Sequence, residues 1–495
     1  SPAEGEIPMK RRMTKDGKPR QDGTNRRYFL KYSALATGYG VWVATEKNEV
    51  ALAQQAANDR VNVAWVGVGG KGDSDSSQVT KFANLVAICD VDEDHTNKKL
   101  DELKKAGKPA PKVFNDWRKM FDEMGKEIDA CGTSIPDHNH AIVTIHAMKM
   151  GKHVYTQKPL THTVAEARMM REVANEMKIV SQMGNQGTAT PGLRSGVEAI
   201  QAGAIGNVKE IHIWTNRPIW PQAPVLMKWP EAQSVPSTMN WDVWLGPAPE
   251  TPYNKEIAPF NWRGYWRFGT GAMGDMGCHT CNLPYMGTEL TEPTKVKAVC
   301  ADLNPVTYPA WATVEYEFPN PKGGDPIKVV WYEGHFGYTK MKRDPRSGEM
   351  VPDQIQNLPP KPLFHGVKPS TSGSLTVGDK GTLYSPQDYG GSWMLLPKEK
   401  FVDFKNPEPT LPRFKGNRED DNMKLEWINA IKGEGKTLSN FNYASRLVEF
   451  ILLGNVANRN PGDTLEWDTK EMKFTNNEAA NKLLKVEYRD GWSLT

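Results

Sequence analysis

Residues 61–72 read VNVAWVGVGGKG, and this stretch decides the fold. A mostly apolar run of six residues, typical of a buried strand, leads into four closely spaced glycines. Their spacing fits G-x-G-x-x-G, in which glycines allow a tight turn and a close approach of the backbone to a diphosphate. The helix that follows would offer unpaired N–H groups to the same anion. The sequence therefore predicts a dinucleotide-binding loop made by Gly67, Gly69, Gly70 and Gly72.

A second apolar run, residues 85–89, ends at Asp90, eighteen residues beyond Gly72. An acidic residue in this place accepts hydrogen bonds from the adenosine ribose and repels a 2′-phosphate. Asp90 therefore favours NAD over NADP as the cofactor. Further apolar runs at 128–133 and 153–156, with helical stretches between the runs, predict βαβ units and a parallel sheet.

The pattern changes near residue 184. From Lys209 onward apolar and polar residues alternate, as expected of strands with one buried face; the clearest segments are 210–215, 295–301, 313–318 and 327–332. Two late helical stretches, 420–431 and 443–457, should pack back on the body. We predict an α/β chain with a Rossmann domain and a second α/β domain built on a large, mostly antiparallel open sheet; the expected limits are 1–57 for a leader, 58–185 and 186–495.

The first 57 residues resemble a targeting segment rather than a folded domain. Arg26 and Arg27 begin a twin-arginine pattern, an apolar stretch runs from Tyr32 to Ala44, and small residues follow at 51–53. We predict export of the folded protein by the twin-arginine translocase to the periplasm or another extracytoplasmic compartment. A disordered basic tail is the alternative.

Composition excludes several other classes of protein. The net charge of +3 is concentrated in the leader, so the near-neutral body is not expected to bind nucleic acid. No apolar run reaches the roughly 18 residues of a membrane-spanning helix. Five cysteines are too few for a disulfide framework in 495 residues. Cys278 and Cys281 flank His279 as in a metal site, but no second pair supplies further ligands, so we predict no metal.

Three polar segments follow one another along the chain. They are 133–140 (TSIPDHNH), 151–160 (GKHVYTQKPL) and 269–279 (GTGAMGDMGCH). At these residues the chain resembles the Gfo/Idh/MocA oxidoreductases, above all exported, sugar-related bacterial members that share a stretch like NWDVWLGP at 240–247. The resemblance implies a Rossmann domain joined to an open-sheet α/β domain, with a carbohydrate substrate between them. It also implies a homo-dimer or homo-tetramer formed through the open sheet.

The resemblance assigns three catalytic residues, Lys158, Asp275 and His279. Lys158, from the family's E-K-P motif, would lie beside the nicotinamide and stabilise developing alkoxide character. Asp275 and His279 match a D-x-x-x-H pair and share one face if the segment is helical. His279 would act as general base, with Asp275 orienting it or sharing its proton. Gln157 stands where most of the family has Glu, which removes a negative neighbour of Lys158.

The remaining predicted contacts belong to the cofactor and the substrate. By resemblance, cofactor contacts are also expected from Pro136, His140, Gln157, Lys158 and Asn185. Seven tryptophans fall between Trp214 and Trp266; such rings stack on sugars, and arginines fork onto hydroxyls or carboxylates. Aromatic packing under the long loops is the alternative to a carbohydrate-lined cleft. The predicted substrate-binding residues are Arg217, Trp220, Trp262 and Arg263.

These expectations favour an NAD-dependent oxidoreductase that transfers a hydride to or from a hydroxyl carbon of a sugar or sugar derivative. Two alternatives stay open. One is a redox-neutral, NAD-dependent glycosidase that oxidises its substrate transiently, eliminates the aglycone and reduces the product again. The other is a non-catalytic sugar-binding protein on the same scaffold, against which the retained Lys158, Asp275 and His279 argue.

Overall fold

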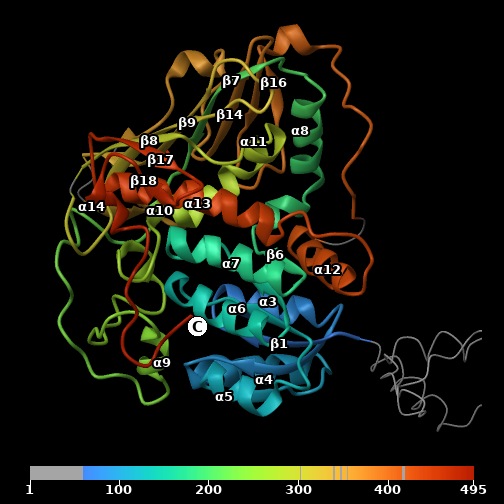
Figure 1. Ribbon diagram of the computed structural model, residues 1–495, viewed down its shortest axis with the longest axis vertical. Helices are drawn as coiled ribbons and strands as arrows, with labels where there is room; N and C mark the ends of the chain where they lie inside the picture. Colours follow the sequence, from blue (N-terminus) through green and yellow to red (C-terminus); the bar gives the residue numbers. More distant parts are fainter. Residues whose placement is uncertain are drawn as a thin grey trace, which may run out of the picture. The chain divides into compact units, whose positions relative to one another are not determined.

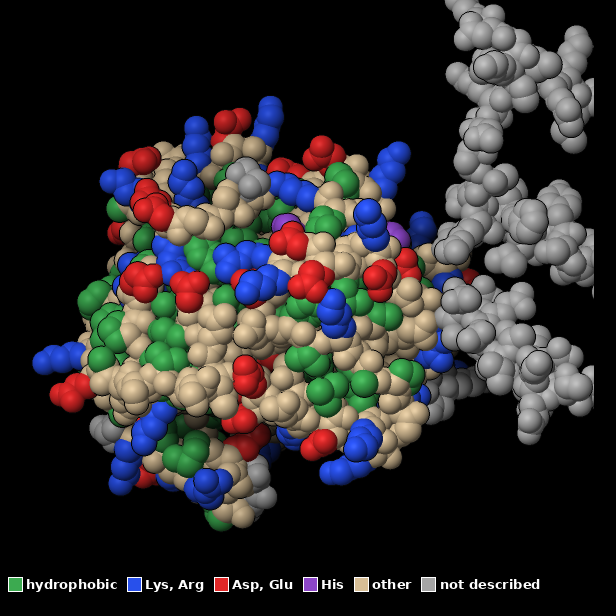
Figure 2. All heavy atoms as spheres, turned by 90° about the horizontal axis from the view of Figure 1, so that it is seen from below, with side chains coloured by type: hydrophobic (Ala, Val, Ile, Leu, Met, Phe, Trp, Pro, Cys, Tyr) green, Lys and Arg blue, Asp and Glu red, His purple; other side chains and the backbone are tan. Residues whose placement is uncertain are grey.

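The computed structural model describes residues 60–494, except 302, 338–339, 346–347, 354 and 415–417. From Arg60 onward the chain forms one compact unit. The predicted twin-arginine leader, 1–57, lies outside the described residues, so export stays a prediction. Within the described part, no helix is long and apolar enough to cross a membrane. On the face seen in Figure 2, Lys and Arg side chains lie interspersed with Asp and Glu rather than gathered by sign.

The first sheet has six strands in the order β3-β2-β1-β4-β5-β6, and every pairing is parallel. The order reverses between β1 and β4, and in such sheets ligands bind at the carboxyl ends of the strands beside that point. The two outer strands are three residues long, too short to stand out in the sequence. The bounds are β1 (Asn62–Val66), β2 (Asn84–Cys89), β3 (Lys112–Phe114), β4 (Ala130–Thr133), β5 (His153–Thr156) and β6 (Ser181–Met183).

Helices cover both faces of this sheet (Figure 1). Alternate residues of β1 enter two different apolar clusters, since side chains along a strand point to opposite faces. Val63 and Trp65 pack with α3 (Lys71–Val79), α4 (Glu93–Lys105) and α12 (Glu419–Ile431). Ala64 and Val66 pack in the other cluster, with α5 (Trp117–Met124), α6 (His140–Lys149) and α7 (Val164–Glu176).

The second sheet follows the order β16-β15-β14-β7-β10-β9-β8-β17-β18, with β13 paired to β10. Only the β7–β10 pairing is parallel among these described strands, which confirms the predicted mostly antiparallel sheet. The bounds are β7 (Val208–Trp214), β8 (Lys295–Cys300), β9 (Trp311–Phe318), β10 (Ile327–Phe336), β13 (Ile355–Gln356), β14 (Gly373–Gly378), β15 (Thr382–Ser385), β16 (Met394–Leu396), β17 (Thr464–Asp468) and β18 (Lys473–Phe474), besides a separate hairpin of β11 (Met341–Arg343) and β12 (Met350–Pro352).

One face of the second sheet is packed against helices, and the other is covered by an apolar cluster around Phe364 toward β16 but carries exposed ion pairs at β9. On β9, Val314 and Tyr316 enter the apolar cluster beneath α10 (Gly271–Thr280) and α13 (Phe441–Asn458). On the opposite face Glu315 pairs with Lys328 at 3.1 Å. This exposed face is the one through which an oligomer is predicted, and that prediction stays open. The remaining helices are α8 (Pro191–Gln201), α9 (Trp241–Leu245), α11 (Asn282–Gly287) and α14 (Glu478–Asn481).

The two late helices return to the first sheet and its helices, as predicted. Trp427 of α12 is fully buried, with its ring 5.6 Å from that of Tyr155 on β5. α13 packs between α7 and the second sheet. A single apolar cluster therefore contains residues of both sheets, and the C-terminal segment ends against the helices of the first sheet, where Trp492 packs on Trp117.

Candidate active site

The glycine loop lies at the carboxyl end of β1, where its path requires glycine. Gly67 has φ +84°, and a Cβ there would lie 2.2 Å from the backbone oxygen of Ser134. At Gly72 a Cβ would lie 2.0 Å from the oxygen of Gly67, so this glycine serves helix–strand packing. Gly70 has φ +51° with no atom within 4 Å of its Cβ position, so the loop is open there. In the described structure no side chain caps the N-terminus of α3.

Asp90 supports this loop from the end of β2. One carboxylate oxygen accepts hydrogen bonds from the backbone N–H groups of Val68 (2.8 Å) and Gly69 (3.2 Å). The other accepts from Asp92 N–H at 3.0 Å and lies 3.2 Å from Nδ1 of His95. The hydrogen bond with Asp90 raises the pKa of His95. Asp90 therefore lies where the sequence predicted, and its contact with a ribose stays a prediction.

A cavity of about 490 Å³ extends from the glycine loop to α10. It brings together most of the residues predicted from the sequence. At one end it is lined by the loop and Asp90, and at the other by α10 and the aromatic loops. The predicted residues in its wall are Gly67, Gly69, Gly70, Asp90, Pro136, Gln157, Lys158, Arg217, Trp262, Arg263, Asp275 and His279.

Lys158 and Asp275 form an ion pair in the wall of this cavity. The Lys158 ammonium donates to Oδ1 of Asp275 at 2.9 Å and to its backbone oxygen at 2.8 Å. Nε of Arg263 lies 3.4 Å from the same Oδ1. Burial alone would raise the pKa of Asp275, but the charges of Lys158 and Arg263 outweigh it and hold the pKa well below its usual range. Asp275 is therefore ionised, and its described hydrogen bonds go to these cations rather than to His279.

His279 is buried on the same helix, one turn after Asp275. Within the described chain, its Nδ1 has no hydrogen-bond partner. Burial, assisted by the charge of Lys158, keeps the pKa of His279 well below its usual value. The imidazole is therefore neutral, and one ring nitrogen is available to accept a proton. Its ring meets that of Tyr389 edge-on at 4.6 Å.

Asp137 is a cavity residue that the sequence reasoning did not single out. It lies in the wall between the glycine loop and α10, and it accepts a hydrogen bond from Oγ of Thr270 at 2.6 Å. Burial raises the pKa of Asp137 to about 7. The residue belongs to the quoted segment 133–140, but an acid beside a proline in a loop gives no signal of burial until the fold is known.

Three residues predicted to contact the cofactor, Gly72, His140 and Asn185, do not line the cavity. The ring nitrogens of His140 each lie 2.7 Å from a backbone oxygen, those of Pro159 and Ile135. Asn185 is fully buried and donates to the backbone oxygen of Cys278 at 3.3 Å. Both side chains are held by protein groups, as buried polar groups usually are. They therefore support the segments that line the cavity rather than the cavity itself.

The predicted aromatic wall is only partly present. Trp262 and Arg263 line the cavity, with the guanidinium 4.3 Å from the ring centre. Trp220 is buried outside the lining, where it donates to Gln222 at 3.0 Å and packs against Phe260. For Trp220, the alternative of aromatic packing under the loops describes the structure better than stacking on a sugar.

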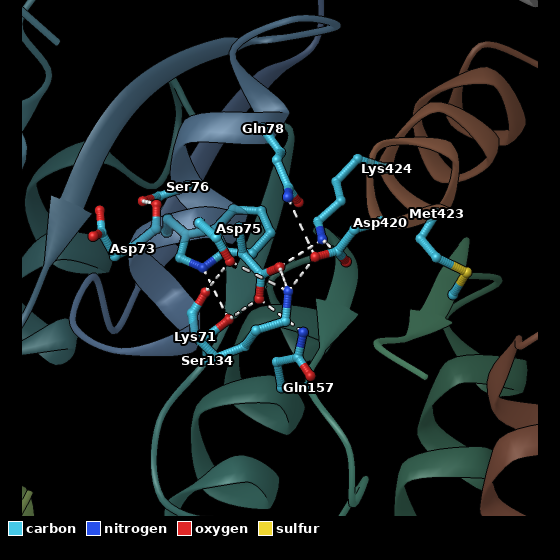
Figure 3. A network of polar contacts seen from close by, with 12 residues as sticks. Lys71, Asp73, Asp75, Ser76, Gln78, Ser134, Gln157, Asp420, Met423 and Lys424 are labelled. Carbon is cyan, nitrogen blue, oxygen red and sulfur yellow. Dashed lines mark hydrogen bonds and ion pairs between the residues drawn. The ribbon is translucent and has the colours of Figure 1, made fainter. Parts of the chain in front are cut away.

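Gln157 contacts the carboxylate of Asp75, which lies just after the glycine loop and 82 positions away in the sequence. Its Nε2 donates to Oδ2 of Asp75 at 2.7 Å (Figure 3). In the sequence, Gln157 shows only the loss of the family's carboxylate, yet the fold places another carboxylate beside it.

In the part of the chain that the structure describes, no group of three or more potential ligands could hold a metal ion. Cys278 and Cys281 are buried, and burial raises the pKa of both thiols.

The arrangement fits a dinucleotide. The open position at Gly70 and the uncapped N-terminus of α3 suit a diphosphate. Asp90 lies at the same end, where a ribose would follow. The nicotinamide end would then lie toward Lys158 and His279, with the apolar side chains of Ile135 and Pro136 in the wall between.

Comparison with known proteins agrees with this geometry. Residues 61–185 match the family model of the oxidoreductase family, NAD-binding Rossmann fold, and residues 215–327 match its C-terminal alpha/beta domain. Levoglucosan dehydrogenase of Pseudarthrobacter phenanthrenivorans is 25% identical over 34% of this chain and 35% of its own length. Glycosyl hydrolase family 109 protein 1 of Akkermansia muciniphila is 31% identical over 24% of this chain and 26% of its own. The matches thus span about a third or less of these relatives.

Solved structures share the fold at low identity. The WlbA dehydrogenase from Bordetella pertussis, in complex with NADH and UDP-GlcNAcA, has a TM-score of 0.52 and 14% identity, with 83% of this chain and 99% of that chain covered. Both domain models occur here in the family's order, on the two sheets described above. The chain therefore belongs to the Gfo/Idh/MocA oxidoreductases, with an NAD-binding Rossmann domain at residues 61–185.

Proposed function

We propose that the protein transfers a hydride to or from a hydroxyl carbon of a sugar or sugar derivative. The observation that carries this proposal is His279: a buried, neutral imidazole in the cavity wall, with one nitrogen left without a partner in the described chain. Nδ1 is shielded from the cavity, so a substrate hydroxyl there would meet the other ring nitrogen, Nε2. The named relatives, among them a levoglucosan dehydrogenase, favour a carbohydrate as substrate.

NAD, when bound, supplies the acceptor or donor of the hydride. The chain's own residues manage the proton. In the direction of oxidation His279 takes the proton of the substrate hydroxyl while the C–H bond breaks. The Lys158 ammonium, fixed by Asp275, stabilises the oxygen as it gains negative charge. Asp275 keeps its own charge throughout, because Lys158 and Arg263 hold it ionised.

A redox-neutral glycosidase is the second candidate. It is favoured by one specific observation: several relatives are named glycosyl hydrolase family 109 proteins, and the sequence matches them at 29–31% identity. The two candidates use the same hydride step. They differ in what accumulates, since a dehydrogenase leaves NADH and a keto-sugar, and the glycosidase releases an aglycone without net NADH.

The test is to compare Lys158→Ala with the parent protein on a panel of sugars and glycosides, following nicotinamide absorbance and released aglycone together. Turnover should fall about a hundredfold or more, the usual contribution of a positioned polar group, while NADH still binds. Lys152→Ala is the matched control, because Lys152 lies just before the other end of β5 and should change neither quantity. Full activity of Lys158→Ala in either assay would contradict the role assigned to Lys158. Absence of turnover by the parent protein on the whole panel would instead favour a sugar-binding protein.

A further inference from the structure

The carboxylate of Asp75 is buried at the centre of a polar network that joins distant parts of the chain (Figure 3). Asp75 lies on α3, one turn after the glycine loop, and is fully buried. Its Oδ1 lies 2.8 Å from Nζ of Lys71 and 2.5 Å from Nζ of Lys424. Its Oδ2 accepts hydrogen bonds from Ser134 at 2.9 Å and from Gln157 at 2.7 Å.

The network is balanced in charge. Asp420 of α12 pairs with Lys424 at 2.8 Å and with Lys71 at 2.5 Å. Two lysines therefore face two aspartates, and the side chain at position 157 is neutral. A further buried charge would have no counter-ion, which is strongly destabilising in a protein interior. This balance explains why an amide, and not a carboxylate, stands at position 157.

The amide of Gln157 has one orientation that satisfies its surroundings. Nε2 donates to Asp75, while Oε1 accepts the backbone N–H of Lys158 at 3.3 Å. Gly184 leaves the space, since a Cβ there would lie 2.6 Å from Nε2. An ionised glutamate could accept from Lys158 but could not donate to Asp75. A chain of hydrogen bonds thus runs from Asp75 through Gln157 to the backbone of Lys158.

We propose that Asp75 is the positioning residue of the segment Gln157–Lys158. Its carboxylate fixes the Gln157 amide, and the amide fixes the backbone from which the Lys158 side chain reaches Asp275. The same carboxylate binds Lys71 of the glycine loop, so one buried group sets both the cofactor end and the catalytic end of the cavity. The role of Lys158 in this inference rests on the proposed function; the geometry of the pair does not.

A charge swap tests the pair directly. Asp75→Asn removes the carboxylate and keeps the shape. Gln157→Glu adds a second carboxylate against the first, so that one must take up a proton. The double variant, Asp75→Asn with Gln157→Glu, again has one carboxylate and one amide at hydrogen-bond distance. Ser134→Ala removes a single hydrogen bond to Asp75 without changing any charge, and serves if a charge variant does not fold.

The matched control is Lys81→Met. Lys81, just after α3, pairs with Asp421 of α12 at 2.8 Å. Its loss loosens the contact of α3 with α12 but leaves Asp75 and Gln157 untouched. Each variant is measured in three ways: NADH affinity by fluorescence titration, thermal unfolding between pH 4 and 8, and kcat and KM on a sugar that the parent protein turns over.

We expect each single variant to bind NADH about tenfold more weakly and to lose about tenfold to a hundredfold in kcat with a smaller change in KM, since small misplacements cost this much. The double variant should recover kcat to within about threefold but not the NADH affinity, because Lys71 and Lys424 still lack the carboxylate of Asp75. Ser134→Ala should lose about threefold in NADH affinity and in kcat, and Lys81→Met should bind NADH like the parent. Gln157→Glu should lose stability as pH rises above about 4, because its folded state holds a proton that the unfolded chain releases. The double variant should lack that trend.

Two results would overturn the inference. The first is parent-like NADH affinity in both single charge variants, or in Ser134→Ala if the charge variants do not fold. The second is a double variant whose kcat is as impaired as the two single changes combined, because the placement of the charge would then not matter. If the parent turns over no sugar, the proposed function fails, and the binding and unfolding measurements alone decide on Asp75.

Discussion

At the scale of single residues, the buried imidazole of His279 is isolated from solvent and lies near positive charge. The sequence assigned Asp275 as the partner of His279, but the carboxylate of Asp275 forms ion pairs with Lys158 and Arg263 instead. The carboxylate therefore does little to favour an imidazolium. His279 is therefore neutral and can accept a proton without first losing one. The carboxyl group in this cavity whose pKa lies near neutrality is that of Asp137.

The pH dependence of turnover follows from this. The pKa of His279 is lowered, so the imidazole stays neutral as pH falls through 6.5 and protonates only well below it. His279→Asn should therefore lower kcat/KM about a hundredfold at every pH from 5.5 to 8.5 without moving the profile. His365→Asn is the control, because His365 is exposed with φ +46°, a conformation that Asn also adopts. An inflection at pH 6.5 that vanishes in His279→Asn would mean that His279 titrates normally.

At the scale of elements, α12 shows what a sequence pattern can and cannot predict. The stretch 420–431 was recognised as a late helix that packs back on the body, and α12 spans Glu419–Ile431. Its period marks a buried face but not the surface that it meets. Trp427 meets β5 and β1, and Lys424 meets Asp75 at a separation of 349 positions. No local spacing indicates such a contact.

Removing the central side chain of α12 should destabilise the whole unit. Trp427→Ala leaves a cavity between the helix and the first sheet, and truncations of this kind cost about 3–5 kcal/mol. Trp427→Phe, which keeps most of the packing, should cost less. Thermal and urea unfolding measure both, with Val402→Ala at a 78% exposed position as the control. If Trp427→Ala has the same free energy of unfolding as the control, the packing of α12 against the first sheet does not stabilise the protein.

The same contrast explains the strands and the site. Strands of at least four residues, such as β1 and β5, were predicted within a few positions, while β3 and β6, with three residues each, are too short to show a period. Residues within motifs, such as Lys158 and His279, reached the cavity. Trp220 did not, because composition indicates that aromatic rings cluster but not which of them face a ligand.

At the scale of the whole molecule, stability must depend on pH through carboxyl groups buried far from solvent. Glu333 on β10 is 1% exposed, and its Oε2 accepts a hydrogen bond from Nε1 of Trp331 at 2.8 Å. Burial raises the pKa of Glu333 to about 7. A raised carboxyl pKa means that the folded state holds a proton that the unfolded chain releases first. The contribution of protonated Glu333 to the free energy of unfolding is complete below about pH 4 and is lost as pH rises toward 7.

Glu333→Gln keeps the shape and the acceptor but removes the charge. It should raise stability at pH 8 by up to about 3 kcal/mol, since one pKa unit corresponds to about 1.4 kcal/mol, and change little at pH 5. Thermal unfolding at the two pH values checks the sign. Glu315→Gln, on the exposed face of the neighbouring β9, is the control. Equal effects of Glu333→Gln at pH 5 and 8 would show that Glu333 is not the group that titrates.

The return of α12 and α13 to the first sheet has a consequence for synthesis. When the ribosome has finished β6, the faces of the first sheet that α12 and α13 will cover are still bare. Those helices are made roughly 230 to 270 residues later, which takes some tens of seconds at about 5–20 residues per second. During this interval Trp65, Tyr155 and the apolar side of α7 have no native cover. Until the last sixth of the chain emerges, these apolar side chains stay exposed, and such exposure makes an incomplete chain prone to aggregation.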